Sequence, residues 1–253
     1  MKRICGYVVS LAGVAGLMGS VLPACATNDQ SIFIDGVLAP SANRVGGACT
    51  YNADPTQPHL SEATLDLGLT DSYRAVLLVG NQLIPRGDPQ NNRSESNRVH
   101  INGAIVKVQN PDGSSIREFT SLTSGFAEPQ NNNAAGYAPI GVVVFDAPTK
   151  DIVLPSVQAK FSSRTLLLVV KVFGTSLGGE DLESGEYQFP MQVCRGCLVR
   201  QDGYDGASMT QPLNCDQPAA TAATADGPCF PGQDLSISCK DCRGFDVCDP
   251  NKK

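Results

Sequence analysis

One continuous apolar run predicts the central strand of a β-sheet: Thr165-Leu166-Leu167-Leu168-Val169-Val170-Lys171-Val172-Phe173. Leucine and β-branched valine dominate this run, a composition that is typical of strands covered on both faces. A strand of this kind needs hydrogen-bonded neighbours, so the run predicts a sheet to which other parts of the chain contribute strands.

Shorter stretches before and after the run carry the pattern of such neighbours. Leu65, Leu67 and Leu69 alternate with polar residues, as in a half-buried strand. The sequence Asn110-Pro111-Asp112-Gly113 is rich in turn-forming residues and predicts a hairpin. We expect the remaining strands at residues 73–84, 99–109, 116–119, 140–145, 152–161 and 186–194.

Hardly any window of the sequence shows the 3.6-residue apolar period of a helix. Many short strands without helices predict an all-β fold, an antiparallel immunoglobulin-like β-sandwich over residues 49–194. The polar segments 86–98 and 128–138 are expected as loops at the ends of this sandwich. Residues 195–253 contain few apolar side chains, so we expect an irregular, disulfide-rich C-terminal extension that cross-links hold in place.

The N-terminus has the charge order of a secretory signal peptide over residues 1–24. Lys2 and Arg3 precede a long apolar stretch, and no further charge follows until Asp29. The alternative is a transmembrane anchor, because the stretch approaches the length that spans a bilayer. The glycines within it favour the signal peptide.

The end of this segment, Leu22-Pro23-Ala24-Cys25, resembles the bacterial lipobox. The resemblance implies that Cys25 carries the lipid and that residues 25–48 form a lipidated N-terminus and a tether. Several acyl chains on one residue anchor a protein stably to a membrane. Ala26 follows the cysteine in place of the aspartate of the inner-membrane retention signal, which favours the outer membrane. Cleavage after Ala24 or Ala26, with Cys25 left as an ordinary thiol, is the alternative.

The ten cysteines divide into three groups. Cys5 leaves with the signal peptide and Cys25 is consumed by the lipid, so eight remain as disulfide candidates in an exported protein. If all eight pair, Cys49 must bond to a cysteine of the C-terminal region, because the other seven all lie there. The eight are Cys49, Cys194, Cys197, Cys215, Cys229, Cys239, Cys242 and Cys248.

Two C-x-x-C pairs leave other chemistry open. Cys194 with Cys197, and Cys239 with Cys242, have the spacing of two halves of a tetrathiolate zinc site. Either pair could also be redox-active, although neither stands at a helix start between two strands. Export favours disulfides over both alternatives.

Composition and motifs exclude several classes of function. The formal net charge is −6 and the pI is about 4.9, whereas nucleic-acid binders carry a basic face. No nucleophile elbow, P-loop or dinucleotide fingerprint is present to serve as a catalytic or cofactor site. His59 and His100 could each orient a serine, but both are expected as surface histidines. We therefore expect a protein that is not an enzyme and that holds no cofactor and no metal.

Several phrases of the sequence together resemble a group of uncharacterised outer-membrane lipoproteins of myxobacteria and related deltaproteobacteria. They are Gly36-Val37-Leu38-Ala39-Pro40, Leu77-Leu78-Val79-Gly80-Asn81-Gln82-Leu83, Glu95-Ser96-Asn97-Arg98-Val99, Gly103-Ala104-Ile105-Val106, Leu177-Gly178-Gly179 and Phe189-Pro190 leading to Cys194-Arg195-Gly196-Cys197-Leu198. The resemblance implies outer-membrane anchoring and a β-rich ectodomain with a cysteine-rich C-terminus, and it implies no particular substrate.

These observations predict a non-catalytic, lipid-anchored envelope protein with a structural, adhesive or protein-interaction role. Its expected partners are the membrane, through lipidated Cys25, and an envelope protein, with no nucleic acid. The alternative is a periplasmic or surface module that binds a ligand or polysaccharide. A zinc or redox protein that uses the C-x-x-C pairs is a further alternative.

Overall fold

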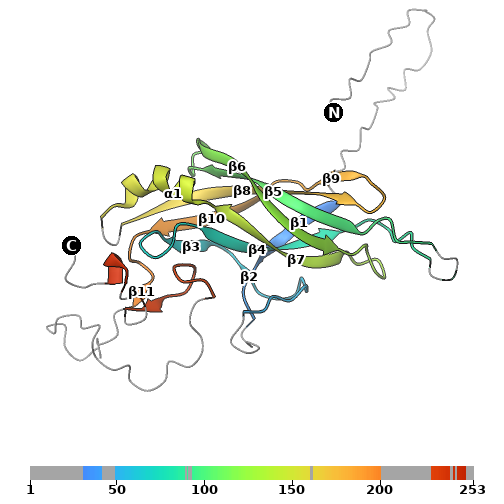
Figure 1. Cartoon of the computed structure of the whole chain (residues 1–253), viewed down its shortest axis with the longest axis horizontal. Helices are drawn as coiled ribbons and strands as arrows, with labels where there is room; N and C mark the ends of the chain where they lie inside the picture. The colour runs from blue at the N-terminus through green and yellow to red at the C-terminus, as the bar shows by residue number, and fades with distance from the viewer. Residues whose placement is uncertain are drawn as a thin grey trace, which may run out of the picture.

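The computed structural model describes residues 31–41, 49–88, 90, 93–159, 162–200, 229–239, 242 and 244–248. The expected signal peptide, Cys25 and Cys215 lie outside these residues. The described chain is mostly β-structure, as predicted, and it is arranged in two large sheets and one small one (Figure 1).

The first sheet has four strands. Their order across the sheet is β2 (His59–Leu60), β1 (Ile32–Leu38), β4 (Tyr73–Asn81) and β7 (Gly136–Phe145). All of the pairings in this sheet are antiparallel.

The second sheet is built around the apolar run that was expected to be central. That run lies in β8 (Ser163–Ser176), which pairs with strands on both sides. The order is β3 (Ala63–Asp66), β10 (Tyr187–Cys194), β8, β5 (Val99–Gln109) and β6 (Ser115–Ala127), and β9 (Asp181–Glu183) pairs with the end of β8. The β3–β10 pairing is parallel and the others are antiparallel.

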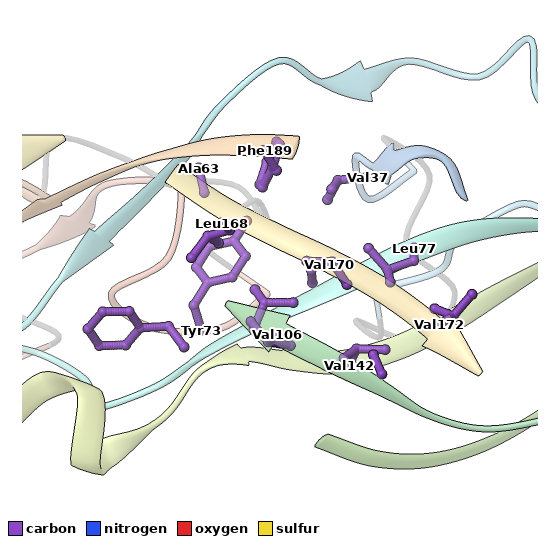
Figure 2. Close-up of a cluster of buried hydrophobic side chains, with 14 of the residues drawn as sticks. Val37, Ala63, Tyr73, Leu77, Val106, Val142, Leu168, Val170, Val172 and Phe189 are labelled. Carbon is purple, nitrogen blue, oxygen red and sulfur yellow. The ribbon is translucent and has the colours of Figure 1, made fainter. Parts of the chain in front are cut away.

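The two sheets enclose one hydrophobic core. Strand β4 directs Ala75, Leu77 and Val79 into it, and β8 directs Leu166, Leu168, Val170 and Val172 into it from the opposite side. Figure 2 shows Leu77 and Val142 of the first sheet close to Val106 and Val170 of the second. The period-2 alternation of these strands is what allows each to bury one face here.

On one side of the core, side-chain hydroxyls join the two sheets. Thr123 of β6 donates a hydrogen bond to the backbone oxygen of Gly141 in β7 at 2.8 Å. The Val143 amide of β7 donates to the Ser121 hydroxyl at 3.2 Å. Strand β6 therefore curls toward β7, and the two sheets form a half-open barrel (Figure 1).

The first strand lies where the sequence predicted a tether. Residues Ile32–Leu38 form β1, which pairs with β4 in the register Ile32↔Asn81 and Val37↔Leu77. Ile32 and Val37 are almost fully buried in the core. The folded domain thus includes Ile32–Leu38, which were expected in the tether, because the apolar side chains of this strand pack in the core of the first sheet.

The prediction of a strand at residues 152–161 is wrong. The helix α1 (Ala147–Val153) and the 3-10 helix η3 (Leu154–Val157) occupy most of this range. The Asp146 carboxylate accepts a hydrogen bond from the Thr149 amide at 3.0 Å, which caps the helix, and proline occupies its first turn. Thr149, Val153 and Val157 are buried at four-residue intervals, a helical period that is too short to recognise in the sequence.

A small third sheet belongs to the cysteine-rich region. It pairs β11 (Val199–Arg200) with β12 (Ile237–Ser238) in parallel, and the 3-10 helix η4 (Asp246–Cys248) follows. A second apolar cluster joins this region to Leu69 of the main domain. Its buried members are Leu69, Leu198, Cys239, Cys242, Val247 and Cys248.

Candidate binding site

Part of the cysteine-rich region returns to the main domain. We name residues 229–235 the strap. A disulfide joins Cys229 at its start to Cys49, 180 residues earlier in the sequence. The backbone of the strap continues along the free edge of β3, where the Asp66 amide donates to the oxygen of Gly232 and the Asp234 amide donates to the oxygen of Thr64, both at 2.9 Å. The strap therefore covers the exposed edge of the second sheet.

Side chains of the strap also reach the first sheet. The Gln233 amide nitrogen donates to the Ser72 oxygen at 2.9 Å, next to the start of β4. The Tyr73 hydroxyl donates to Asp234 Oδ2 at 2.7 Å, and the Thr64 amide donates to Asp234 Oδ1 at 3.0 Å. Asp234 thus links β4 in one sheet to β3 in the other. The strap therefore bridges the two sheets on this side.

Burial governs the electrostatics of this link. It raises the pKa of the Asp234 carboxyl, and the hydrogen bonds from Thr64 and Tyr73 only partly oppose this. Burial, and next the Asp234 charge, raise the pKa of Tyr73 far above its usual range. The Tyr73 hydroxyl is therefore protonated at physiological pH and acts as a hydrogen-bond donor.

A cavity of about 250 Å³ lies between the strap and the first sheet. Residues of the first sheet and residues of the strap line the cavity. The apolar side chains among them include Leu38, Leu60, Val76, Phe230 and Leu235. Polar residues that also line the cavity are Tyr51, Arg74, Gln233 and Asp234. An apolar wall with a few polar groups is the usual composition of a small-molecule pocket.

A buried carboxylate organises the C-x-x-C loop at the end of β10. The loop amides of Gly196 and Leu198 donate to the two Asp66 oxygens at 2.7 and 3.0 Å, and the Gly68 amide donates to Oδ1 at 3.0 Å. Asp66 is fully buried, so these charge-assisted hydrogen bonds compensate for its loss of water. Cys194 is buried, whereas Cys197 is exposed at the tip of the loop.

The disulfides account for all but one of the eight candidate cysteines. The bonded pairs are Cys49–Cys229, Cys194–Cys197 and Cys242–Cys248. Cys239 is disulfide-bonded as well, and Cys215 lies outside the described residues. The expected bond from Cys49 to the C-terminal region is confirmed. The two C-x-x-C pairs are not halves of one tetrathiolate site here, because Cys194 bonds to its own partner and Cys242 bonds to Cys248.

Neither histidine lines the cavity. His59 lies 3.7 Å from the Asp35 carboxylate at the edge of the first sheet. His100 lies 2.9 Å from the Ser124 hydroxyl and stacks on Phe126, on the outer surface of β5 and β6. The His100–Ser124 pair brings a histidine into contact with a serine. It lies on an open sheet surface.

Asp66, Tyr73 and Asp234 are not among the site residues predicted from the sequence. The local sequence does point to a structural role for Asp66, because a carboxylate between Leu65 and Leu67 at the end of a strand needs hydrogen-bond donors. The local sequence gives no such indication for Asp234, since its partners Thr64 and Tyr73 are more than 160 residues away in the sequence. Its role depends entirely on the strap.

No protein-family model matches the sequence, and no curated protein matches it. Among solved structures, the chain is similar to a protein assigned to the late embryogenesis abundant (LEA) group. The identity is 12%, the match covers 53% of this chain and 71% of the other, and the TM-score is 0.26. Within the part of the chain that the structure describes, no helix is both long and apolar enough to cross a bilayer.

Proposed function

We propose that the protein is a non-catalytic, lipid-anchored protein of the bacterial cell envelope with a structural, adhesive or protein-interaction role. The disulfides are the observation that carries this proposal, because such bonds persist in oxidising, extracytoplasmic compartments. The lipobox resemblance at Cys25 supplies the anchor, and the outer membrane is the membrane we infer from Ala26. The partner is an envelope protein that the ectodomain contacts.

We infer further that the domain is an immunoglobulin-like sandwich. The strand neighbours support this, because β1-β4-β7 and β5-β8-β10 correspond to the A-B-E and C-F-G neighbours of that fold. Strand β6 follows β5 at the edge of the second sheet. Sandwiches of this type commonly act as binding modules through their end loops and edge strands.

The test of the anchor compares the wild-type protein with Cys25→Ser in a bacterial host. We expect the wild type in the detergent-soluble membrane fraction, with an intact mass that includes a diacylglyceryl group on Cys25. We expect Cys25→Ser in the aqueous fraction without that mass. Wild-type protein that is recovered free of membranes and without added acyl mass would refute lipid anchoring.

The cavity under the strap favours a second candidate function, the binding of a small apolar ligand. Its volume suits a compact molecule that has one polar group facing Arg74 or Asp234. A small apolar fluorescent dye should bind the wild type, and Val76→Phe should reduce its affinity at least tenfold by filling the cavity. Pro139→Ala, on an exposed position of the neighbouring strand β7, is the matched control. Equal dye affinity in both variants would exclude the cavity as the binding site.

A further inference from the structure

Three potential metal-ligand side chains converge beside the C-x-x-C loop. A carboxylate oxygen of Asp66 and the sulfurs of Cys194 and Cys197 all lie within 4.8 Å of one another. They come from the end of β3, the end of β10 and the loop that follows. Asp66 and Cys194 are register partners in the parallel pairing of β3 with β10.

The positions of these three side chains do not depend on the disulfide alone. The Leu67 amide donates to the backbone oxygen of Cys194 at 2.8 Å, which continues the strand pairing to the ends of both strands. The amides of Gly196 and Leu198 hold the loop on the Asp66 carboxylate. Opening the sulfur–sulfur bond therefore leaves both cysteines close to the carboxylate.

Once the Cys194–Cys197 bond is open, the residue types suit a divalent cation that prefers sulfur and oxygen ligands. Zinc binds cysteine sulfur at about 2.3 Å and carboxylate oxygen at about 2.0–2.2 Å, so two sulfurs on one tetrahedral ion lie about 3.8 Å apart. Small side-chain rotations bring ligand atoms within 4.8 Å to that spacing. Oδ2 of Asp66 accepts one hydrogen bond, from Leu198, among the described residues, and so keeps a lone pair for a metal.

The charges favour a cation once the disulfide is reduced. Asp66 is buried, and two thiolates beside it would repel each other and the carboxylate. A divalent cation compensates all three groups at once. We propose that the reduced Asp66–Cys194–Cys197 cluster is a zinc-binding site and that the disulfide is its closed, metal-free state. The proposed envelope function rests on the oxidised form of the same two cysteines, so the zinc site forms only where a reductant opens their bond.

The conversion balances with an external dithiol as the reductant. A thiolate of the dithiol attacks the exposed sulfur of Cys197, and the Cys194–Cys197 bond breaks. The dithiol is oxidised to its own disulfide, and its two protons end on Cys194 and Cys197. Zinc then displaces both thiol protons as it binds. Cys197 is exposed, so the reductant and the metal reach the site from solvent, which also supplies a water for the fourth ligand position.

Zinc binding to the mature full-length protein, reduced with a phosphine, tests the proposal. A chromophoric zinc chelator serves as the competitor, and cobalt(II) serves as a spectroscopic substitute. We expect the reduced protein to bind zinc and to show sulfur-to-cobalt charge-transfer absorption, and the oxidised protein to show neither. Far-ultraviolet circular dichroism follows the β-sheet content throughout. Loss of the sheet signal on reduction would overturn the proposal, because the site requires the folded β3–β10 pairing.

Two double variants locate the metal. Cys194→Ser/Cys197→Ser should lower zinc affinity at least a hundredfold and abolish the cobalt band. The matched control Cys242→Ser/Cys248→Ser removes another short-range pair and should retain both. Asp66→Asn keeps every thiol and should lower zinc affinity at least tenfold. Equal zinc affinity in the two double variants would refute the site, and so would zinc binding by the oxidised wild type.

Discussion

Asp234 shows how one residue can connect distant parts of this protein. Its carboxylate receives a hydrogen bond from Thr64 at the edge of one sheet and from Tyr73 at the start of a strand in the other. It adopts a positive backbone φ of 58°, which aspartate and asparagine tolerate better than most residues. Asp234 therefore combines a turn conformation, a buried carboxyl group and a contact between the two sheets.

Replacing Asp234 should change the pH dependence of stability. Burial raises the pKa of this carboxyl, so the folded state binds its proton more tightly than the unfolded state does. Its contribution to the free energy of unfolding is then fully present below the unfolded pKa and is lost as the pH rises through the folded pKa. Asp234→Asn does not titrate; its side-chain oxygen can still accept from the Thr64 amide, and its amide nitrogen can donate to the Tyr73 hydroxyl oxygen, which reverses the direction of that hydrogen bond. Relative to the wild type, we expect the variant to gain stability as the pH rises from about 3 to neutrality, measured by urea denaturation at each pH.

Asp234→Ala serves as the control. It removes both hydrogen bonds and should cost about 1–3 kcal/mol, because the Thr64 amide and the Tyr73 hydroxyl lose their acceptor. A stability difference between wild type and Asp234→Asn that does not vary with pH would contradict the role assigned to burial.

At the scale of secondary-structure elements, the alternation of apolar and polar residues along the sequence identified the strands whose inner faces form the core. The expected strand at residues 99–109 coincides with β5, and the one at 186–194 differs from β10 by a single residue. The turn at residues 110–113 is confirmed by the Gly113 amide, which donates to the Asn110 oxygen at 2.9 Å, and by the positive φ of Gly113. These elements were predictable because their burial pattern and turn residues are local in the sequence.

Elements with a weak or mixed local pattern were not predictable. Strand β6 extends to Ala127, beyond the expected residue 119, and much of it is exposed at a sheet edge. The segment 152–157, which holds the end of α1 and all of η3, was predicted as a strand because a short helical segment with several apolar residues fits either period. Strand β1 was assigned to the tether because its neighbours in the sheet are distant in sequence.

The packing of η4 on the main domain provides a test at this scale. Val247 lies against Gly68, where an added Cβ would come within 2.3 Å of Val247 Cγ1. Gly68→Ala should therefore displace η4 and cost about 1–3 kcal/mol, as overpacking usually does. Urea denaturation measures the cost, and limited proteolysis should cleave the C-terminal region faster. Gly244→Ala is the matched control, because an added Cβ there has no neighbour within 4 Å. Equal behaviour of the two variants would show that η4 does not pack as described.

At the scale of the whole molecule, the described part of the cysteine-rich region packs against the β-domain. The strap hydrogen-bonds to both sheets, and Cys49–Cys229 fixes its start. The second apolar cluster holds the following segments against Leu69. Disulfides and a small apolar cluster together hold a region that has too few apolar residues to fold alone.

Among the disulfides Cys49–Cys229, Cys194–Cys197 and Cys242–Cys248, the first should contribute most to stability. It closes a loop with a sequence separation of 180, for which chain entropy predicts a contribution of at most about 5 kcal/mol. The Cys242–Cys248 pair, with a separation of 6, should contribute about 2 kcal/mol on the same basis. We expect Cys49→Ser/Cys229→Ser to lower the free energy of unfolding more than Cys242→Ser/Cys248→Ser, measured by denaturation without reductant. The reverse order would show that the strap is held mainly by its hydrogen bonds.

The sequence alone predicts that this protein is β-rich, which run lies at the centre of a sheet, and that Cys49 bonds into the C-terminal region if all eight candidate cysteines pair. Each of these follows from local periodicity or from counting cysteines. The tertiary structure was needed to show that residues 32–38 join the first sheet, that the strap bridges the two sheets beside a cavity, and that Asp66 lies beside the C-x-x-C loop. These depend on which strand edges meet, and edge pairing is settled by burial and backbone hydrogen bonds between residues far apart in the chain.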